Sequence, residues 1–328
     1  MASLKTVFSL LFLISFSLND SVTSATKTPA SVVRETPLLL TYHNGPLLSG
    51  QITLNLLWYG NFTSSQRAII LDYLHSLSHP INAIPSHQNS SLSPPSVSQW
   101  WRTIGKYVVP NSQNTQKPAV LRVGKQAIHS SYSLGRFLTR ANLSSVVRTL
   151  ARPGSITLVL TAHDVNPEGF CLGTCGHHSW VRLPSLERAP YIWVGDSSSQ
   201  CPGLCAWPFH KPAYGPQGPS LVAPNGDVGS DGLVMNIAKL LGGTVTNPLG
   251  GGFYEGEEEL CMEEVGLCME AGSACVGVYG KGAYPGYTGE VLVDELSGGS
   301  YNAVGMRGRK YLLPALWDPQ THKCETLV

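Results

Sequence analysis

The chain has 328 residues, with 22 Lys and Arg against 21 Asp and Glu, and only 13% of its residues are charged. Soluble domains average about 25% charged residues. A nearly neutral chain lacks the basic surface that nucleic acid requires, so nucleic acid is excluded as a partner. Abundant Gly and Pro with few charges suit a protein of the extracellular matrix better than one of the cytosol.

Residues 1–25 have the build of a secretory signal peptide. Lys5 precedes an apolar run, Val7 to Leu18, that is too short to cross a bilayer, and small residues end at Ala25. An uncleaved anchor would need a longer run and flanking charges. We therefore expect cleavage near Ala25, a single mature domain over residues 26–328, and no membrane segment after cleavage. Sequons at Asn61, Asn89 and Asn142 are then credible glycosylation sites, and we expect at least two of them to be used.

The first mature elements are a strand and a helix. Gln51 to Tyr59 shows partial alternation of apolar residues, which is typical of a strand. Residues 64–77 place apolar side chains on one helical face, with Ser64 as the expected N-cap and His79-Pro80 beyond the end.

A loop rich in Ser, Asn and Pro (85–95) leads to a second expected helix over Val97 to Val108. Trp100 and Trp101 lie in this helix. Core packing is the favoured interpretation of the two indoles, and stacking on sugar rings is the alternative.

Two further strands and a helix follow. Ser155 to Val165 is an apolar, β-branched run that predicts a buried strand, and Tyr191 to Val194 predicts a shorter one. Asp231 to Gly243 predicts an amphipathic, half-buried helix with its cap at Ser230 or Asp231 and its end at the glycine pair 242–243. The Asp- and Gly-rich segment 225–232 lacks the full frame of a calcium loop and is interpreted as the turn before this helix.

All eight cysteines lie in the second half of the chain, and an even number in an exported protein predicts four disulfides. The two short loops, 171–175 and 201–205, are expected either to close on themselves or to pair with one another. Disulfides are expected to replace an apolar core in the Gly-rich C-terminal half. The cysteines are Cys171, Cys175, Cys201, Cys205, Cys261, Cys268, Cys275 and Cys324.

The densest group of potential catalytic residues is His163, Asp164, His177 and His178. Imidazoles and a carboxylate could hold zinc, but no HExxH occurs, and histidines beside cysteine loops more often bond backbone carbonyls. No G-x-S-x-G occurs either, and disulfide-bonded cysteines cannot act as nucleophiles. Carboxylates for glycoside hydrolysis could come from Asp164, Glu168, Asp196 or the cluster 255–259, a pairing that any chain of this length offers. We therefore predict no catalytic residue, no metal and no cofactor.

Long motifs spread over the chain resemble the plant EXORDIUM or phosphate-induced-protein family, from about Leu40 to Cys324. They are LTYHNGPLLSGQITLNLLWYGNFT, FCLGTCGHH, WVGD, CPGLCAWPF, APNGDVGSDGLV, IAKLLGGTVTNP and RKYLLPALWDPQTHKC. The resemblance implies an apoplastic, wall-associated glycoprotein linked to cell expansion, brassinosteroid-promoted growth and nutrient status. It implies no known reaction.

The string IAKLLGGTVTNP also resembles the helix pattern IAHELAEAxTNP of zinc peptidases. On that pattern the ligand positions fall on Lys239 and Gly243, and the catalytic glutamate falls on Leu240. None of these side chains can serve the role, which implies a degenerate peptidase site. The Lys239 ammonium could replace the metal ion electrostatically and hold His163 or Asp164 in place.

The sequence thus predicts a single α/β domain with a central mixed sheet, zincin-like ancestry and a disulfide-stapled C-terminal half. The expected function is non-catalytic binding of a cell-wall glycan, a peptide or a receptor ectodomain, with His163, Asp164, His177, His178 and Lys239 as candidate cleft residues. The alternatives are a wall-modifying hydrolase that uses the cleft around His163 and Asp164, and an inert structural wall protein.

Overall fold

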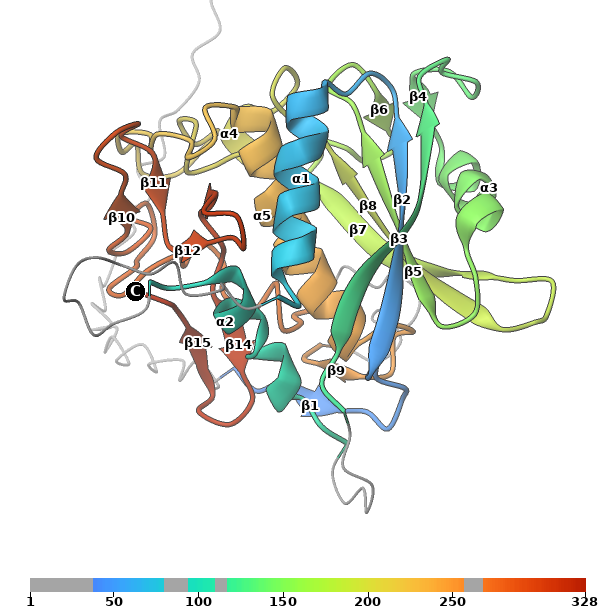
Figure 1. The fold of residues 1–328 in the computed structure, drawn as a ribbon. Coiled ribbons are helices and arrows are strands. Elements are labelled where there is room, and N and C mark those ends of the chain that lie inside the picture. The colour runs from blue at the N-terminus through green and yellow to red at the C-terminus, as the bar shows by residue number, and fades with distance from the viewer. Residues whose placement is uncertain (1–37, 80–93, 110–116, 257–267) are drawn as a thin grey trace, which may run out of the picture. The chain divides into compact units, whose positions relative to one another are not determined.

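The computed structural model describes residues 38–79, 94–109, 117–256 and 268–328 (Figure 1). The predicted signal peptide, the sequon at Asn89 and Cys261 lie outside these ranges.

A five-stranded sheet in the order β3-β2-β5-β8-β7 forms the centre of the fold. Four strands run parallel, and β7 is an antiparallel strand at the edge, so the predicted mixed sheet is confirmed. β5 is buried along its whole length because helices cover both faces of the sheet. The strands are β2 (Gln51–Tyr59), β3 (Val120–His129), β5 (Ser155–Thr161), β7 (Gly176–Arg182) and β8 (Arg188–Gly195).

The helices α1 (Ser64–Ser76) and α5 (Val228–Thr246) lie on one face of the sheet, and α3 (Arg140–Leu150) lies on the other (Figure 1). The N-cap of α1 is Thr63 rather than the predicted Ser64. The Thr63 side chain accepts a hydrogen bond from the backbone of Gln66, whose own side chain accepts one from the backbone of Thr63. This reciprocal pair satisfies two backbone donors, which a cap at Ser64 would leave open.

Helix α5 is longer and more deeply buried than the sequence predicts. It is capped by Asp227, whose side chain accepts from the backbone of Ser230, and it continues through the glycine pair to Thr246. The glycines do not end it because both lie against neighbours: a Cβ on Gly242 would touch Leu316, and one on Gly243 would meet Glu270. Within the described ranges, no helix combines the length and the apolarity needed to cross a bilayer.

The region predicted as one helix over 97–108 is broken into α2 (Val97–Trp101) and a short 3-10 turn, η1 (Ile104–Lys106). Trp100 and Trp101 are both buried, and their indole N–H groups donate to the carbonyls of Pro314 and Ala119. Core packing of this pair is confirmed.

Short elements complete the fold. They are α4 (Pro202–Cys205) and five two-stranded ladders: β1 (Thr41–Tyr42) with β9 (Phe253–Tyr254), β4 (Phe137–Leu138) with β6 (Asn166–Pro167), β10 (Leu292–Val293) with β11 (Ser300–Tyr301), β12 (Ala303–Val304) with β13 (Lys310–Tyr311), and β14 (Leu316–Asp318) with β15 (Lys323–Glu325).

The C-terminal segment shares the main core, contrary to the expectation that disulfides replace one there. Leu313 and Leu316 are fully buried in the same cluster as the sheet. The Tyr311 hydroxyl donates to the carbonyl of Ile69 and to Asp72 on α1, both at 2.9 Å. These contacts come from residues 311–318, which are all buried but include only the end of β13 and the short strand β14, so no helix or strand period marks them in the sequence.

The two short cysteine loops pair with one another. Cys171 bonds Cys201, and Cys175 bonds Cys205, each across 30 residues. A third disulfide joins Cys275 to Cys324, and Cys268 is also oxidised. The two loops are therefore bonded to one another rather than closed on themselves. The Cys175–Cys205 bond links the start of β7 to α4.

Candidate functional site

A cavity of about 370 Å³ lies between the edge strand β7, helix α5 and the segment 268–273. His177 and His178 line it from β7, Lys239 and Leu240 from α5, and Glu270 from the segment opposite. Its volume falls in the range of roughly 300–1,000 Å³ that is typical of small-molecule sites. The structure therefore brings together three of the five predicted cleft residues.

His178 and Glu270 form a buried pair at one end of this cavity. The Nε2 atom of His178 lies 2.7 Å from Oε2 of Glu270, and both side chains are almost fully buried. Asn247 donates from Nδ2 to the other oxygen of Glu270 at 2.6 Å and accepts from the backbone of Gly252. The Glu270 carboxylate is thus held from both sides and serves the packing of this end of the cleft.

Gly243 lies directly against that pair. A Cβ at this position would be 2.4 Å from Oε2 of Glu270 and 3.2 Å from Nε2 of His178. The space that a ligand side chain would need on the peptidase pattern is therefore already occupied by the His178–Glu270 pair.

Lys239 is one helical turn away and its surroundings differ. Burial lowers the pKa of its ammonium group. Among the described residues, no hydrogen bond or ion pair reaches its Nζ atom, whereas Lys106 and Lys310 each contact an aspartate (Asp318 and Asp294). Lys239 therefore presents a partly desolvated cation to the cleft.

The polar wall of the cavity is formed by His177 and Tyr191. The Nε2 atom of His177 lies 3.2 Å from the hydroxyl of Tyr191 on the neighbouring strand. Burial raises the pKa of Tyr191, so its hydroxyl stays protonated.

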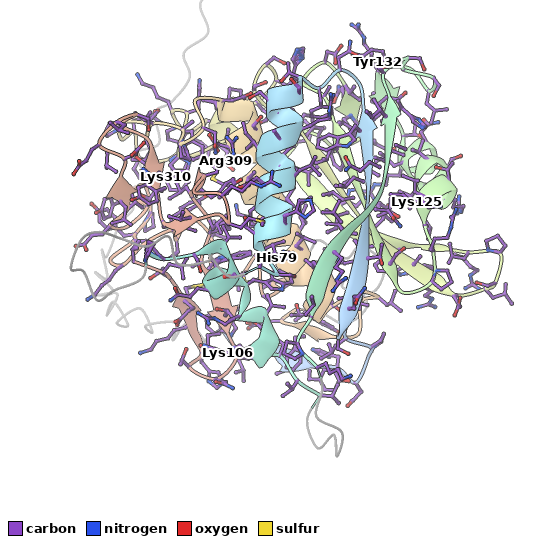
Figure 2. All side chains as sticks on the ribbon, viewed as in Figure 1. His79, Lys106, Lys125, Tyr132, Arg309 and Lys310 are labelled. Atoms are coloured by element: carbon purple, nitrogen blue, oxygen red, sulfur yellow. A yellow bond between two sulfur atoms is a disulfide. The ribbon has the colours of Figure 1, made fainter. Side chains whose placement is uncertain are left out.

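His163 and Asp164 do not line this cavity. They follow the end of β5, which is two strands away from β7, a distance of roughly 10 Å at the usual strand spacing. Asp164 accepts a hydrogen bond from the hydroxyl of Tyr132, which Figure 2 shows beyond the end of β3, and pairs with Arg136 at 3.4 Å. The expectation that Lys239 holds His163 or Asp164 is therefore wrong.

A second cavity, of about 540 Å³, adjoins the first. Asn236, Lys239 and Cys175 line both. Its other walls come from residues around Trp207, Tyr214 and Tyr284. The sequence does not single out these aromatic residues. The Y-P-G-Y turn that carries Tyr284, in which Tyr284 and Tyr287 form an antiparallel bridge, is the local signal that could have marked them.

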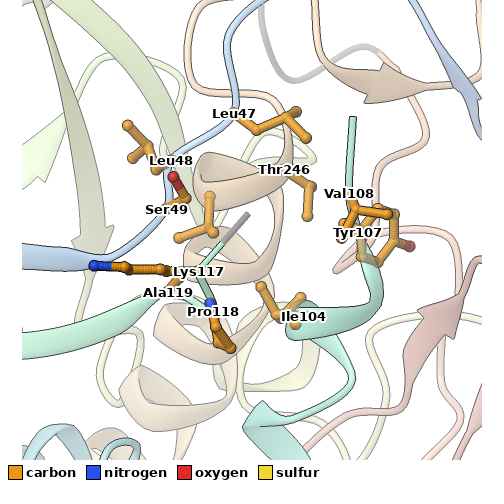
Figure 3. Close-up of a pocket in the computed structure, with 12 residues that line it drawn as sticks. Leu47, Leu48, Ser49, Ile104, Tyr107, Val108, Lys117, Pro118, Ala119 and Thr246 are labelled. Atoms are coloured by element: carbon orange, nitrogen blue, oxygen red, sulfur yellow. The ribbon is translucent and has the colours of Figure 1, made fainter. Parts of the chain in front are cut away.

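A third hollow holds only about 10 Å³, room for roughly one water molecule. It lies between the segment 47–49, η1 and the last turn of α5, where Figure 3 shows Leu47, Ile104, Lys117 and Thr246 around it. Its size makes it a packing defect and not a candidate site.

No group of three His, Cys, Asp or Glu side chains in the described part of the chain is placed to hold a metal ion. Glu270 was not among the predicted residues. Its partner His178 lies 92 residues away, and Glu270 follows a cluster of glutamates (255–259) that draws attention in the sequence.

Two of the three sequons lie in described residues. Asn61 is exposed. Asn142 is partly buried, and its Oδ1 accepts hydrogen bonds from the backbone and the hydroxyl of Thr139 in the cap of α3. Asn61 is therefore the more accessible of the two acceptors.

Comparison with known proteins identifies the family. The model of the phosphate-induced protein 1 conserved region matches residues 40–327. Protein EXORDIUM-like 1 of Arabidopsis thaliana is 46% identical over 329 residues, which cover 100% of both chains. Protein EXORDIUM-like 2 of the same plant is 50% identical over 91% of this chain and 93% of its own, and Protein PHOSPHATE-INDUCED 1 of Nicotiana tabacum is 50% identical over 88% of each. No solved structure gives a significant match. The chain belongs to the phosphate-induced protein 1 family, which includes the EXORDIUM proteins.

Proposed function

We propose that this protein is a secreted glycoprotein of the plant cell wall that regulates cell expansion by binding a ligand in the cleft between β7 and α5, without turning it over. One observation carries the non-catalytic part. The positions that the peptidase pattern uses hold Lys239 and Leu240, which line the cleft, and Gly243, which lies against two residues that line it, and none of the three supplies a metal ligand or a general base.

Descent from a zinc peptidase accounts for the location of Lys239, Leu240 and Gly243 in or beside a cleft. Lys239 and Gly243 are one turn apart on α5, so they share a helix face. Lys239 lines the cavity, and Gly243 abuts two residues that line it. This arrangement supports descent from an ancestor that used both positions as ligands, in which Gly243 later made room for the His178–Glu270 pair.

Secretion is supported by the disulfides and by the predicted signal peptide. Disulfides persist in oxidising compartments such as the apoplast, and three are formed by the described cysteines. The proposed partners are a wall glycan, a peptide or a receptor ectodomain, and the proposed biological setting is growth linked to brassinosteroid and nutrient status.

The test is a binding and turnover assay on protein purified from a plant secretory host. We expect a wall-derived glycan or peptide to bind, with no hydrolysis of peptide or polysaccharide and no stoichiometric zinc. Chelator-sensitive turnover that is lost in His163→Ala or Asp164→Ala would instead establish a hydrolase. Firm retention in wall fractions, together with tolerance of every cleft substitution, would point to an inert structural protein.

A further inference from the structure

The cavities of about 370 Å³ and 540 Å³ described above adjoin at Lys239. One has polar residues of β7 and β8 in its wall, including His177 and Tyr191, and the other is lined mainly by apolar residues, among them Trp207, Tyr214 and Tyr284. Asn236 and Lys239 border both, and Asn236 is fixed there because its Nδ2 donates to the carbonyls of Cys205 and Gly232. The amine of Lys239 therefore lies where a ligand that extends through both cavities would pass.

The ammonium group of Lys239 lacks a compensating charge in the described part of the chain. Among the described residues, two carboxylates line the first cavity, and both are engaged elsewhere: Glu270 accepts from His178 and Asn247, and Glu168 accepts from the backbone of Arg140. A cation removed from water without a partner is unfavourable unless an anion joins it. An anionic group on the ligand would supply that partner.

The second cavity offers exposed aromatic faces. Tyr214 is 74% exposed and Tyr284 is 65% exposed, although each lines a hollow that also contains Trp207. The ring of Tyr284 packs against that of Tyr287, with centroids 5.0 Å apart, which limits its movement. Flat, exposed rings in a concavity are suited to stack on the C–H faces of sugar rings, and the rings of Trp100 and Trp101 are buried and cannot do so.

We propose that the joined cavities bind an acidic oligosaccharide, with a uronate carboxylate at Lys239 and neighbouring sugar rings on Tyr214, Tyr284 and Trp207. The inference rests on the proposed binding function and adds the class of ligand. Charge complementarity at Lys239 selects an acidic glycan over a neutral one. The hydroxyl of Tyr191 and the imidazole of His177 line the polar cavity, where they are placed to exchange hydrogen bonds with sugar hydroxyls.

The experiment compares trigalacturonate with its full methyl ester by isothermal titration of the secreted, disulfide-bonded protein. The ester keeps the rings and removes the charge. We expect the acid to bind more tightly than the ester. We also expect Lys239→Met to weaken binding of the acid roughly ten- to hundredfold, as loss of a buried charge partner does, and to leave the ester unaffected. The matched control is Lys281→Met, since Lys281 is exposed and outside both cavities.

Tyr284→Ala tests the stacking surface separately, because it should weaken acid and ester by the same factor. Equal binding of acid and ester, with no effect of Lys239→Met, would overturn the carboxylate assignment and leave the proposed binding function standing. Binding of an acidic peptide in place of either sugar, still dependent on Lys239, would overturn the sugar assignment alone. If neither sugars nor peptides bind and no cleft variant alters growth promotion, the proposed function itself fails.

Discussion

Two neighbouring regions of α5 differ in how their polar groups are satisfied. Next to Gly243, each carboxylate oxygen of Glu270 accepts a hydrogen bond. One turn earlier, Lys239 lines the same cleft and forms no ion pair among the described residues. The carboxylate of the first region, the closed region, has its partners within the protein. The amine in the second region, the open region, remains free to bind a ligand in the cavity.

The difference separates a structural role from a binding role on a single helix. A satisfied buried network stabilises and fixes one arrangement, and removal of a member leaves the others without partners. An unpaired charge adds little to the fold, so its presence requires another reason. We therefore expect substitutions near Gly243 to change stability and substitutions at Lys239 to change binding.

The largest effect is expected for Glu270→Ala. It leaves the Nε2 atom of His178 and the Nδ2 atom of Asn247 buried without an acceptor, and breaking a buried pair in this way costs about 3–5 kcal/mol. Urea unfolding measures the loss. Glu290→Ala is the control, because Glu290 is exposed and its removal should change stability by less than about 0.5 kcal/mol. A similar midpoint for both variants would show that the closed region is not structural.

A pH-dependent effect is expected at the start of the same helix. Burial, followed by the repulsion of Asp227, raises the pKa of Asp231 to about 7, although hydrogen bonds from Asn225 and the charge of Arg309 oppose this. The folded state therefore holds a proton that the unfolded chain releases near pH 4. Stability from this group is fully present below that pH and is lost as the pH rises toward 7, by up to about 4 kcal/mol.

Asp231→Asn should remove this decrease in stability with rising pH, because asparagine does not titrate. Thermal unfolding of both proteins across this pH range measures how steeply stability changes with pH. This slope can be compared even if the substitution also changes stability by a constant amount at every pH. An unchanged slope in the variant would show that another group is responsible.

A smaller loss is expected for Gly243→Ala. Alanine favours a helix over glycine by about 1 kcal/mol, but its Cβ would lie 2.4 Å from an oxygen of Glu270 that cannot move without breaking its bonds. We expect a net loss of about 1–3 kcal/mol. Gly242→Ala gains the same propensity, and its Cβ would lie 3.1 Å from the end of the Leu316 side chain and at ordinary contact distance from Ile104 and Gly272, so it should be near neutral. Equal effects at the two glycines would contradict the close packing described here.

The sequence predicts the three inner strands of the sheet, β2, β5 and β8, because their signals are local, whereas β3, β7 and α3 are not predicted. β2 has the predicted bounds, since an apolar run with β-branched and aromatic residues marks a buried strand wherever it lies. The sequence places the C-terminal end of α5 wrongly because Gly242 and Gly243 are kept helical by tertiary contacts, which a pattern along the chain does not contain. The break after Trp101 has the same origin: both indoles are held by distant carbonyls.

The site could be predicted only in part for a related reason. His177 and His178 are adjacent on β7, and the helix pattern marks Lys239 on α5. The packing of α5 against β7 is therefore enough to bring these three residues into one cavity. His163 and Asp164 lie at the end of a buried strand, which is a reasonable place for a site. Only the strand order, with β8 between β5 and β7, shows that they face elsewhere.

The smallest change in stability is expected for Lys239→Met. An ammonium with a lowered pKa and no ion pair in the described residues contributes little to the fold, so its replacement by an apolar side chain should be neutral or stabilising by up to about 1 kcal/mol. Lys106→Met is the matched variant, because it strips the buried carboxylate of Asp318 of its cation and should cost about 1–2 kcal/mol. Chemical unfolding of both proteins gives the contrast directly. If Lys239→Met proves as destabilising as Lys106→Met, the amine has a partner within the protein, and the region around Lys239 is as closed as the region around Gly243.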